Sequence, residues 1–271
     1  MSDRYDLRSG RGALLISAPH VGTQVPPEIA ARLTDAGRSL IDTDWYADRL
    51  YPFARELEAT VLRARWSRYV VDLNRDPSGH QLYPGARTSA FVPTETFEGE
   101  RLYAAGDEPP ADEIAARKAE YWDPYHLALQ NELARIAEQH GWVMLIDAHS
   151  IWGRLPLLFE GELPVINLGS NGGHSCDPAF LDAAHAAVAS SPYSVAVDGR
   201  FKGGYITRHY GDPAKRVHAL QIEINQTAYL ADGSRTLWDD AKAARLSRVL
   251  SNVCMAVVGY GTGEPAFPAI P

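Results

Sequence analysis

Two histidines stand directly behind apolar runs that are typical of buried strands. His20 follows "ALLISAP" and His149 follows "WVMLIDA". A histidine at a strand end often does no more than hydrogen-bond a turn. In open α/β sheets, however, ligands bind beyond the carboxyl ends of the strands, where both histidines would lie. Because imidazole is the commonest protein ligand for metals, the two form a candidate metal site.

Carboxylates could complete such a site. A catalytic zinc ion typically takes three protein ligands and leaves a fourth position for water. The segment "SLIDTDWYADRLYPFA" offers Asp42 and Asp44 where a helix is predicted to begin. Aspartate at a helix start is also a routine N-cap, so the residues alone leave open which of the two is a ligand.

A third carboxylate lies inside an apolar run. In "VHALQIEINQ", Glu223 is flanked by Ile222 and Ile224, and strand alternation places it on one face with Gln221 and Asn225. That face could be the solvent side of an edge strand. If it is buried instead, desolvation would raise the pKa of Glu223 and suit it to accept a proton from water.

Cationic side chains form a further group of candidates. Arg68 precedes the apolar run of "RYVVDLNRDP" and Asn74–Arg75 follows it, and guanidinium groups pair bidentately with carboxylates. The segment "GRFKGGYITRHYGDP" has a Gly-Gly pair that predicts a mobile loop able to close over a ligand. Three cations lie around this pair: Arg200, Lys202 and Arg208.

Apolar runs alternate with helical patterns along the chain, which predicts an α/β fold with a mixed, largely parallel sheet covered on both faces. The predicted strands are 13–17, 59–64, 69–73, 142–147, 164–168, 194–197 and 218–224. The predicted helices are 44–58, 112–140, 178–190 and 238–258. We expect one domain over residues 1–271, with a polar tail at 1–10 and a long irregular loop at 76–110.

Composition excludes several classes of function. The net charge of −8, without a long cluster of lysine and arginine, argues against a nucleic-acid partner. No apolar stretch is long enough to span a membrane, and the polar start "MSDRYDLRSG" lacks a signal core. We therefore expect a cytoplasmic protein. The motifs GxSxG, GxxxxGK[ST] and GxGxxG are absent, so a serine nucleophile or a nucleotide site lacks support. The sequence does not predict the oligomeric state.

Several segments, taken in order, resemble the N-formylglutamate amidohydrolases (deformylases) of histidine degradation. The segments are "SAPHVGTQVP", "DTDWYADRLY", "RYVVDLNRDP", "LYPG", "DAHS", "LFEGELPVINLGSNGG" and "GRFKGGYITRHYG" with "HALQIEINQ". That family is similar in plan to zinc carboxypeptidases, which implies a three-layer α/β/α sandwich. One departure concerns position 23, where the carboxypeptidase pattern has its acidic ligand and this chain has Thr23.

The resemblance implies a role for each candidate residue. One divalent metal, expected to be zinc, would be held by His20, Asp44 and His149. Asp44 is chosen over Asp42 because the wider family has an aspartate six residues before a helical leucine, here Leu50. Glu223 would be the base and Arg68 the oxyanion donor. The substrate's α-carboxylate would bind Asn74 and Arg75, and its side-chain carboxylate would bind residues of the glycine-containing loop: Lys202, Tyr205 and Arg208.

The implied reaction is hydrolysis of N-formyl-L-glutamate, a small dianion, to formate and L-glutamate. Two alternatives stay open from the sequence. A related metallo-amidase acting on another N-acyl amino acid or a peptide would keep the metal ligands but change the anion pocket. A metal-binding or amino-acid-binding module without activity would not require a base such as Glu223.

Overall fold

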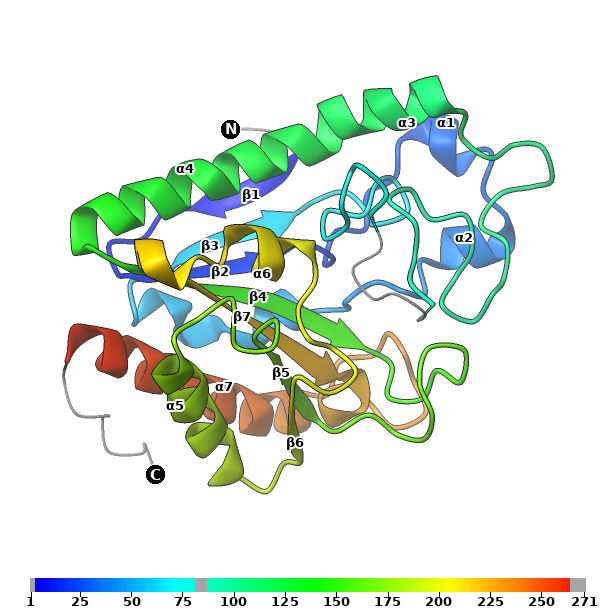
Figure 1. Cartoon of the computed structure of the whole chain (residues 1–271). Helices are drawn as coiled ribbons and strands as arrows, with labels where there is room; N and C mark the ends of the chain where they lie inside the picture. Colours follow the sequence, from blue (N-terminus) through cyan, green and yellow to red (C-terminus); the bar gives the residue numbers. More distant parts are fainter. Residues whose placement is uncertain (1–2, 81–86, 264–271) are drawn as a thin grey trace.

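A seven-stranded mixed sheet forms the middle of the molecule in the computed structural model, which describes residues 3–80 and 87–263 (Figure 1). The strand order is β1-β3-β2-β4-β7-β5-β6. The four inner strands β3, β2, β4 and β7 are parallel, whereas β1 and β5 pair antiparallel to their inner neighbours. The strands are β1 (Tyr5–Arg8), β2 (Leu14–Ala18), β3 (Thr60–Ala64), β4 (Val143–Ile151), β5 (Ile166–Gly169), β6 (Val195–Val197) and β7 (Val217–Asn225).

Helices cover both faces of this sheet and make the three predicted layers (Figure 1). One face carries α3 (Ala111–Arg117), α4 (Asp123–His140) and α6 (Tyr205–Tyr210), and the other carries α5 (Pro178–Ala189) and α7 (Asp240–Thr262). Two short helices, α1 (Pro27–Ala30) and α2 (Asp35–Ser39), lie outside these layers. Within the described residues, no helix is both long and apolar enough to cross a membrane.

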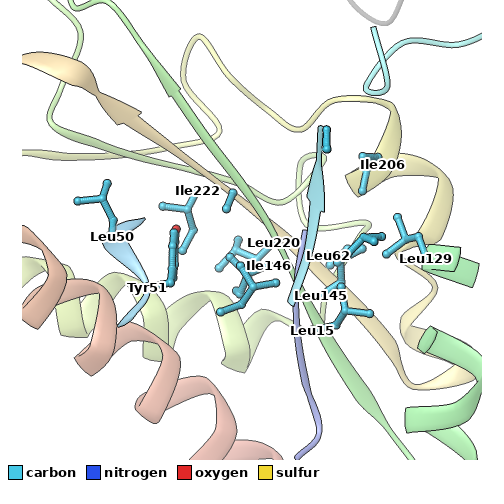
Figure 2. Close-up of a cluster of buried hydrophobic side chains, with 14 of the residues drawn as sticks. Leu15, Leu50, Tyr51, Leu62, Leu129, Leu145, Ile146, Ile206, Leu220 and Ile222 are labelled. Carbon is cyan, nitrogen blue, oxygen red and sulfur yellow. The ribbon is translucent and has the colours of Figure 1, made fainter. Parts of the chain in front are cut away.

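The core lies on both sides of the inner strands. Consecutive strand residues point to opposite faces, so Leu145 and Ile146 enter different layers although both are fully buried. Figure 2 shows the side chains that meet them, with one group toward α4 and α6 and another on the opposite side of the strands. The first group contains Leu15, Leu62, Leu129 and Ile206, and the second contains Leu50, Tyr51 and Ile222.

The predicted polar tail is wrong for residues 5–8, which form the edge strand β1 against β3. The segment looks like a tail in the sequence because its side chains are mostly polar. In the structure, Asp6 accepts two hydrogen bonds from Arg65, at 2.9 and 2.6 Å. An edge strand can be polar because only part of its surface is buried.

Two predicted elements have a secondary structure different from the one predicted. Residues 69–73 are fully buried, but they form two turns joined by an irregular pair of residues outside the sheet. The predicted helix 44–58 consists of two short 3₁₀-helices, Ala47–Leu50 and Pro52–Arg55. Pro52 lacks the N–H that a continuous helix would need at that position, which separates the two pieces.

The predicted helix 112–140 is one long helical segment with a π-turn at Lys118–Trp122. Pro124 follows this turn and cannot donate to the preceding carbonyls, so the hydrogen-bond pattern shifts there. The predicted irregular loop holds no helix and no strand of the main sheet at 76–80 and 87–110. The "LYPG" motif, residues 82–85, lies outside the described residues.

Candidate active site

The register of the two central strands aligns polar side chains at the carboxyl edge of the sheet. Asp147 of β4 lies opposite Gln221 of β7, and His149 lies opposite Glu223 two residues later. Residues two apart on a strand share a face, so all four side chains point to the α4 side. His20 follows the end of β2, the neighbour of β4. The parallel arrangement therefore brings the predicted histidines and Glu223 to one place.

His20, Asp44 and His149 converge as the sequence predicts. Their nearest nitrogen and oxygen atoms all lie within 4.8 Å of one another, and all three side chains are buried. Asp44 Oδ2 is 3.0 Å from His149 Nδ1 and 3.8 Å from His20 Nδ1. The same oxygen accepts a hydrogen bond from the Ser150 backbone N–H at 3.1 Å. Two imidazoles and a carboxylate thus face a common point.

The alternative aspartate has a structural role. Asp42 Oδ2 accepts hydrogen bonds from the Tyr69 hydroxyl at 2.8 Å and from the Phe97 backbone N–H at 2.9 Å. Asp42 is not part of the group that converges with His20 and His149. The geometry therefore favours Asp44 over Asp42, in agreement with the choice based on the resemblance.

Two further carboxylates hydrogen-bond the histidines at Nε2, the ring nitrogen that does not face Asp44. Asp72 Oδ1 lies 2.7 Å from His20 Nε2, and Asp147 Oδ1 lies 2.9 Å from His149 Nε2. A carboxylate on one ring nitrogen fixes the tautomer and leaves the other nitrogen to act as a ligand. We did not predict these two residues. Both are carboxylates inside apolar runs, the same signal that singled out Glu223, so the sequence offered a way to find them.

The residues present fit a divalent cation. Asp44, Asp72 and Asp147 are buried carboxylates, and Arg68 is the buried cation among them, with its Nη2 2.6 Å from Asp72 Oδ2. Burial acts to lower the pKa of His149, but Asp147 and Asp44 hold that pKa well above its usual value. Burial and Arg68 instead lower the pKa of His20, so the three carboxylates, rather than the pKa values of the histidines, are what suit this point to a cation. Two imidazoles and a carboxylate are also a donor set that zinc accepts.

Glu223 is buried rather than on a solvent face. Burial raises its pKa to about 8, and nearby Asp44 adds to this effect. Gln221 Nε2 donates to Glu223 Oε2 at 3.2 Å, while Gln221 Oε1 accepts from the Gly204 N–H at 2.7 Å. The second bond fixes the orientation of the amide, so Gln221 presents a donor to the carboxylate. A buried carboxyl with a raised pKa is suited to proton transfer near neutral pH.

A cavity opens in front of these groups. Arg68, Asn74 and Arg75 lie on its wall together with Glu223. The Asn74 amide is already engaged, because its Oδ1 accepts from the Ile206 N–H at 2.7 Å and its Nδ2 donates to Asp147 Oδ2 at 3.1 Å. Among the residues that the structure describes, the rest of the wall consists of His20, Asp44, Arg87, Thr88, Ser89, Phe97, His149, Ser150, Ile151, Leu158, Arg200, Phe201, Gly204 and Gln221.

Three predicted substrate-binding residues do not reach the cavity wall within the described part of the chain: Lys202, Tyr205 and Arg208. Tyr205 stacks on His209, and Arg208 Nε donates to the Gly203 carbonyl at 2.8 Å. The two glycines have a packing role. A Cβ on Gly204 would lie 2.4 Å from Asn74 Nδ2, and Gly203 has a φ of +113°. This segment therefore needs glycine for close approach and for backbone conformation.

A mixed α/β sheet with buried histidines and carboxylates beyond its parallel strands is the architecture of an α/β enzyme with a candidate metal site. Comparison with known proteins specifies the family. The sequence profile of the N-formylglutamate amidohydrolases matches residues 12–230. The chain is 43% identical over 262 residues to the N-formylglutamate deformylases of Pseudomonas aeruginosa and Pseudomonas putida, which covers 96% of this chain and 98% of each relative. The protein belongs to the N-formylglutamate amidohydrolase family, as the motifs predicted.

Solved structures show the same fold. The crystal structure of N-formylglutamate amidohydrolase from Ralstonia eutropha has a TM-score of 0.81 at 24% identity and covers 96% of this chain and 99% of that one. A gene product from Agrobacterium tumefaciens has a TM-score of 0.72 at 18% identity and covers 97% and 96% of the two chains. The predicted α/β fold is confirmed.

Proposed function

We propose that the protein hydrolyses N-formyl-L-glutamate to formate and L-glutamate with the help of one divalent metal, and that this reaction serves histidine degradation. The observation that carries the proposal is the convergence of His20, Asp44 and His149 beside buried Glu223. The name of the two Pseudomonas relatives, at 43% identity over nearly the whole chain, supports the substrate.

His20, Asp44 and His149 would hold the metal, which we propose to be zinc. When bound, such an ion polarises the formyl carbonyl and makes water more acidic. Asp72 and Asp147 keep both imidazole rings oriented with Nδ1 toward Asp44. This support reduces the reorganisation that binding would otherwise require.

Glu223 is the proposed general base. It accepts a proton from the water that attacks the formyl carbon, and it returns a proton to the amide nitrogen as the C–N bond breaks. Formate and the free amino group of glutamate are the products. The bond from Gln221 keeps the Glu223 carboxylate in one orientation between these two transfers.

Arg68 and Arg75 are proposed to act on the substrate's negative charge. Arg68 is buried on the cavity wall and keeps its charge beside Asp72, so it can stabilise the developing oxyanion. Arg75 would bind the α-carboxylate. Asn74, on the same wall, would orient His149, because its Nδ2 lies 2.8 Å from His149 Nε2 and also donates to Asp147. Such donors matter because the chain carries a net charge of −8 and the substrate is a dianion.

Release of formate or acetate from a panel of N-acyl amino acids tests this function. The panel pairs N-formyl and N-acetyl derivatives of glutamate, glutamine and methionine. The proposal expects N-formyl-L-glutamate to give the highest kcat/KM. A higher kcat/KM for an N-acetyl derivative, or for a neutral side chain, would replace the deformylase by a different amidase.

A further inference from the structure

Helix α6 donates two hydrogen bonds to the polar end of the sheet and its surroundings. The Ile206 N–H donates to Asn74 Oδ1 at 2.7 Å, and the Thr207 hydroxyl donates to Asp147 Oδ2 at 3.0 Å. Threonine in a helix often bonds the carbonyl four residues earlier, but here the acceptor is a carboxylate on a different element. A hydroxyl has one proton to donate, so Thr207 gives its whole donor capacity to Asp147.

Asp147 connects Thr207 to His149. Its Oδ1 lies 2.9 Å from His149 Nε2, while its Oδ2 accepts from Thr207 and also from Asn74 Nδ2 at 3.1 Å. Asp147 is fully buried, and a buried carboxylate is costly unless hydrogen-bond donors surround it. Because two donors hold one oxygen of Asp147, the other oxygen is kept against the imidazole. A continuous path of hydrogen bonds thus runs from α6 to a proposed metal ligand.

Two glycines allow α6 to approach this closely. A Cβ on Gly203 would lie 2.9 Å from Thr207 Cγ2, and a Cβ on Gly204 would lie 2.4 Å from Asn74 Nδ2. Both distances are too short for carbon atoms that are not bonded, so a larger residue at either position would displace its neighbour. The glycine pair therefore permits the packing that brings the Thr207 hydroxyl to Asp147.

The other end of α6 is joined to α4. The Tyr210 hydroxyl lies 2.9 Å from His126 Nδ1, and His126 Nε2 lies 2.8 Å from the Leu73 carbonyl oxygen. The rings of Tyr210 and His126 are stacked, with an angle of 13° between their planes. A helix that is bonded at both ends restricts the positions open to Thr207, which is what a supporting residue needs.

We propose that Thr207 is a positioning residue for metal binding, which through Asp147 holds His149 in the orientation where Nδ1 faces Asp44. This inference rests on the proposed function, because it takes His149 as a metal ligand. Thr207 is fully buried and is not among the described residues that line the cavity. It therefore acts on metal affinity and not on contact with the substrate.

The first measurement is the zinc affinity of Thr207→Val, by competition with a chelator of known affinity. Valine keeps the shape of threonine and removes the hydroxyl. Loss of a residue that supports a metal ligand costs roughly 10–100-fold in metal affinity, and Thr207 is one bond further from the ligand, so we expect a loss of about three- to tenfold. The KM for N-formyl-L-glutamate should stay within about twofold of wild type. Thr207→Ser keeps the hydroxyl and should restore most of the zinc affinity.

Thr60→Val is the matched control. Thr60 is also a fully buried threonine, and its hydroxyl oxygen accepts from the Gly10 N–H at 2.9 Å and from Arg135 Nη2 at 3.1 Å. It lies in β3 opposite Leu15 of β2, in the apolar half of the strands. This variant should lose thermal stability but keep the wild-type zinc affinity. An equal loss of zinc affinity in both valine variants would show a general effect of lost stability and would overturn the proposal.

Asp147→Asn tests the path from Thr207 to His149. If Thr207 acts through Asp147, the two substitutions should not be additive, so Thr207→Val should change the zinc affinity by less than about twofold in the Asp147→Asn background. A loss in that background as large as in the wild type would overturn the proposed path. An unchanged zinc affinity of Thr207→Val in the presence of Asp147 would overturn the positioning role itself.

The proposed function and this inference fail separately. A wild-type protein that binds zinc but releases no formate from N-formyl-L-glutamate would contradict the deformylase, and the zinc affinities of the variants would still test Thr207. Formate release by the wild type, together with wild-type zinc affinity in Thr207→Val, would overturn the positioning role alone. A wild-type protein without measurable affinity for divalent metals would overturn both.

Discussion

The inner strands are apolar in their first half and carry polar site residues at their carboxyl ends. The first residues of β4, Val143–Ile146, are apolar and fully buried, and they pack in the core. Asp147 and His149, at the end of the same strand, are buried to almost the same degree. Burial alone therefore does not separate core from site. The two regions differ in what surrounds each side chain, since apolar groups meet apolar groups and each polar group meets a polar partner.

The polar end of the sheet is a satisfied network. Among the described residues, the buried side-chain atoms without a hydrogen-bond partner belong to Arg32, Trp45, Tyr51 and Trp122, and none to the converging histidines and carboxylates. A fully bonded network in a low-dielectric interior is rigid. The site can thus be preorganised, while the apolar half of each strand supplies the free energy of folding.

The largest effect is expected from removing the charge of Asp44. Asp44→Asn should lower metal affinity by more than the roughly 10–100-fold that loss of a supporting partner costs, and formate release should fall with it. Asp42→Asn is the matched control, because it keeps an acceptor for Tyr69 and Phe97 and should retain the metal. The metal content of both purified variants is the measurement. Loss of metal from Asp42→Asn and its retention in Asp44→Asn would exchange the two roles.

The second-largest effect is expected from loss of the proposed base. Glu223→Gln preserves the shape of the side chain and removes the proton acceptor, so kcat should fall by about 10²–10⁴. Metal content and thermal stability should stay close to those of the wild type. Steady-state kinetics with N-formyl-L-glutamate provide the measurement. A kcat within a few-fold of wild type would mean that Glu223 is not the base.

A substitution in the apolar half of a strand should instead lower the free energy of unfolding and leave the activity of the folded protein unchanged. Leu15 is fully buried in β2, on the strand that leads to His20, and Leu15→Ala should reduce the free energy of unfolding by about 2–5 kcal/mol. Formate release per folded molecule should be unchanged. Leu127→Ala, at a side chain 58% exposed, is the control and should stay within about 0.5 kcal/mol of wild type in urea denaturation.

The smallest effect is expected from the partner of Glu223. Gln221→Leu removes the hydrogen bond to Glu223 and also the one from the Gly204 N–H. The bond to Glu223 is worth about 0.5–1.5 kcal/mol, so kcat should fall by up to roughly tenfold with KM and metal content little changed. A change confined to KM would place Gln221 in substrate binding instead. An unaltered kcat would show that the orientation of Glu223 does not depend on this bond.

The sequence predicts those parts of the fold and site whose signal is local. His20, His149 and Glu223 are polar residues that interrupt or end apolar runs, and a strand-end rule is enough to bring them together. Asp44 required the resemblance, because helix capping explains an aspartate at that position equally well. Parallel strands separated by helices likewise follow from periodicity along the chain.

What the sequence does not predict depends on contacts between distant segments. The edge strand β1 is polar and takes its structure from pairing with β3. Residues 69–73 are as apolar as a strand but find no strand to pair with in the described part of the chain. Arg200 resembles Lys202 and Arg208 in the sequence, but in the structure it lines the cavity and donates hydrogen bonds to the Leu158 and Arg87 carbonyls. The local sequence pattern predicts burial and periodicity, whereas pairing between distant segments depends on the folded chain.

The most direct test of the account measures metal content and formate release on the same sample of purified protein. The account predicts about one equivalent of divalent metal per chain, loss of formate release when a chelator removes it, and recovery when zinc is added back. His20→Ala and His149→Ala should fail to recover although they remain folded. Full turnover of N-formyl-L-glutamate by protein that contains no detectable metal would contradict the account.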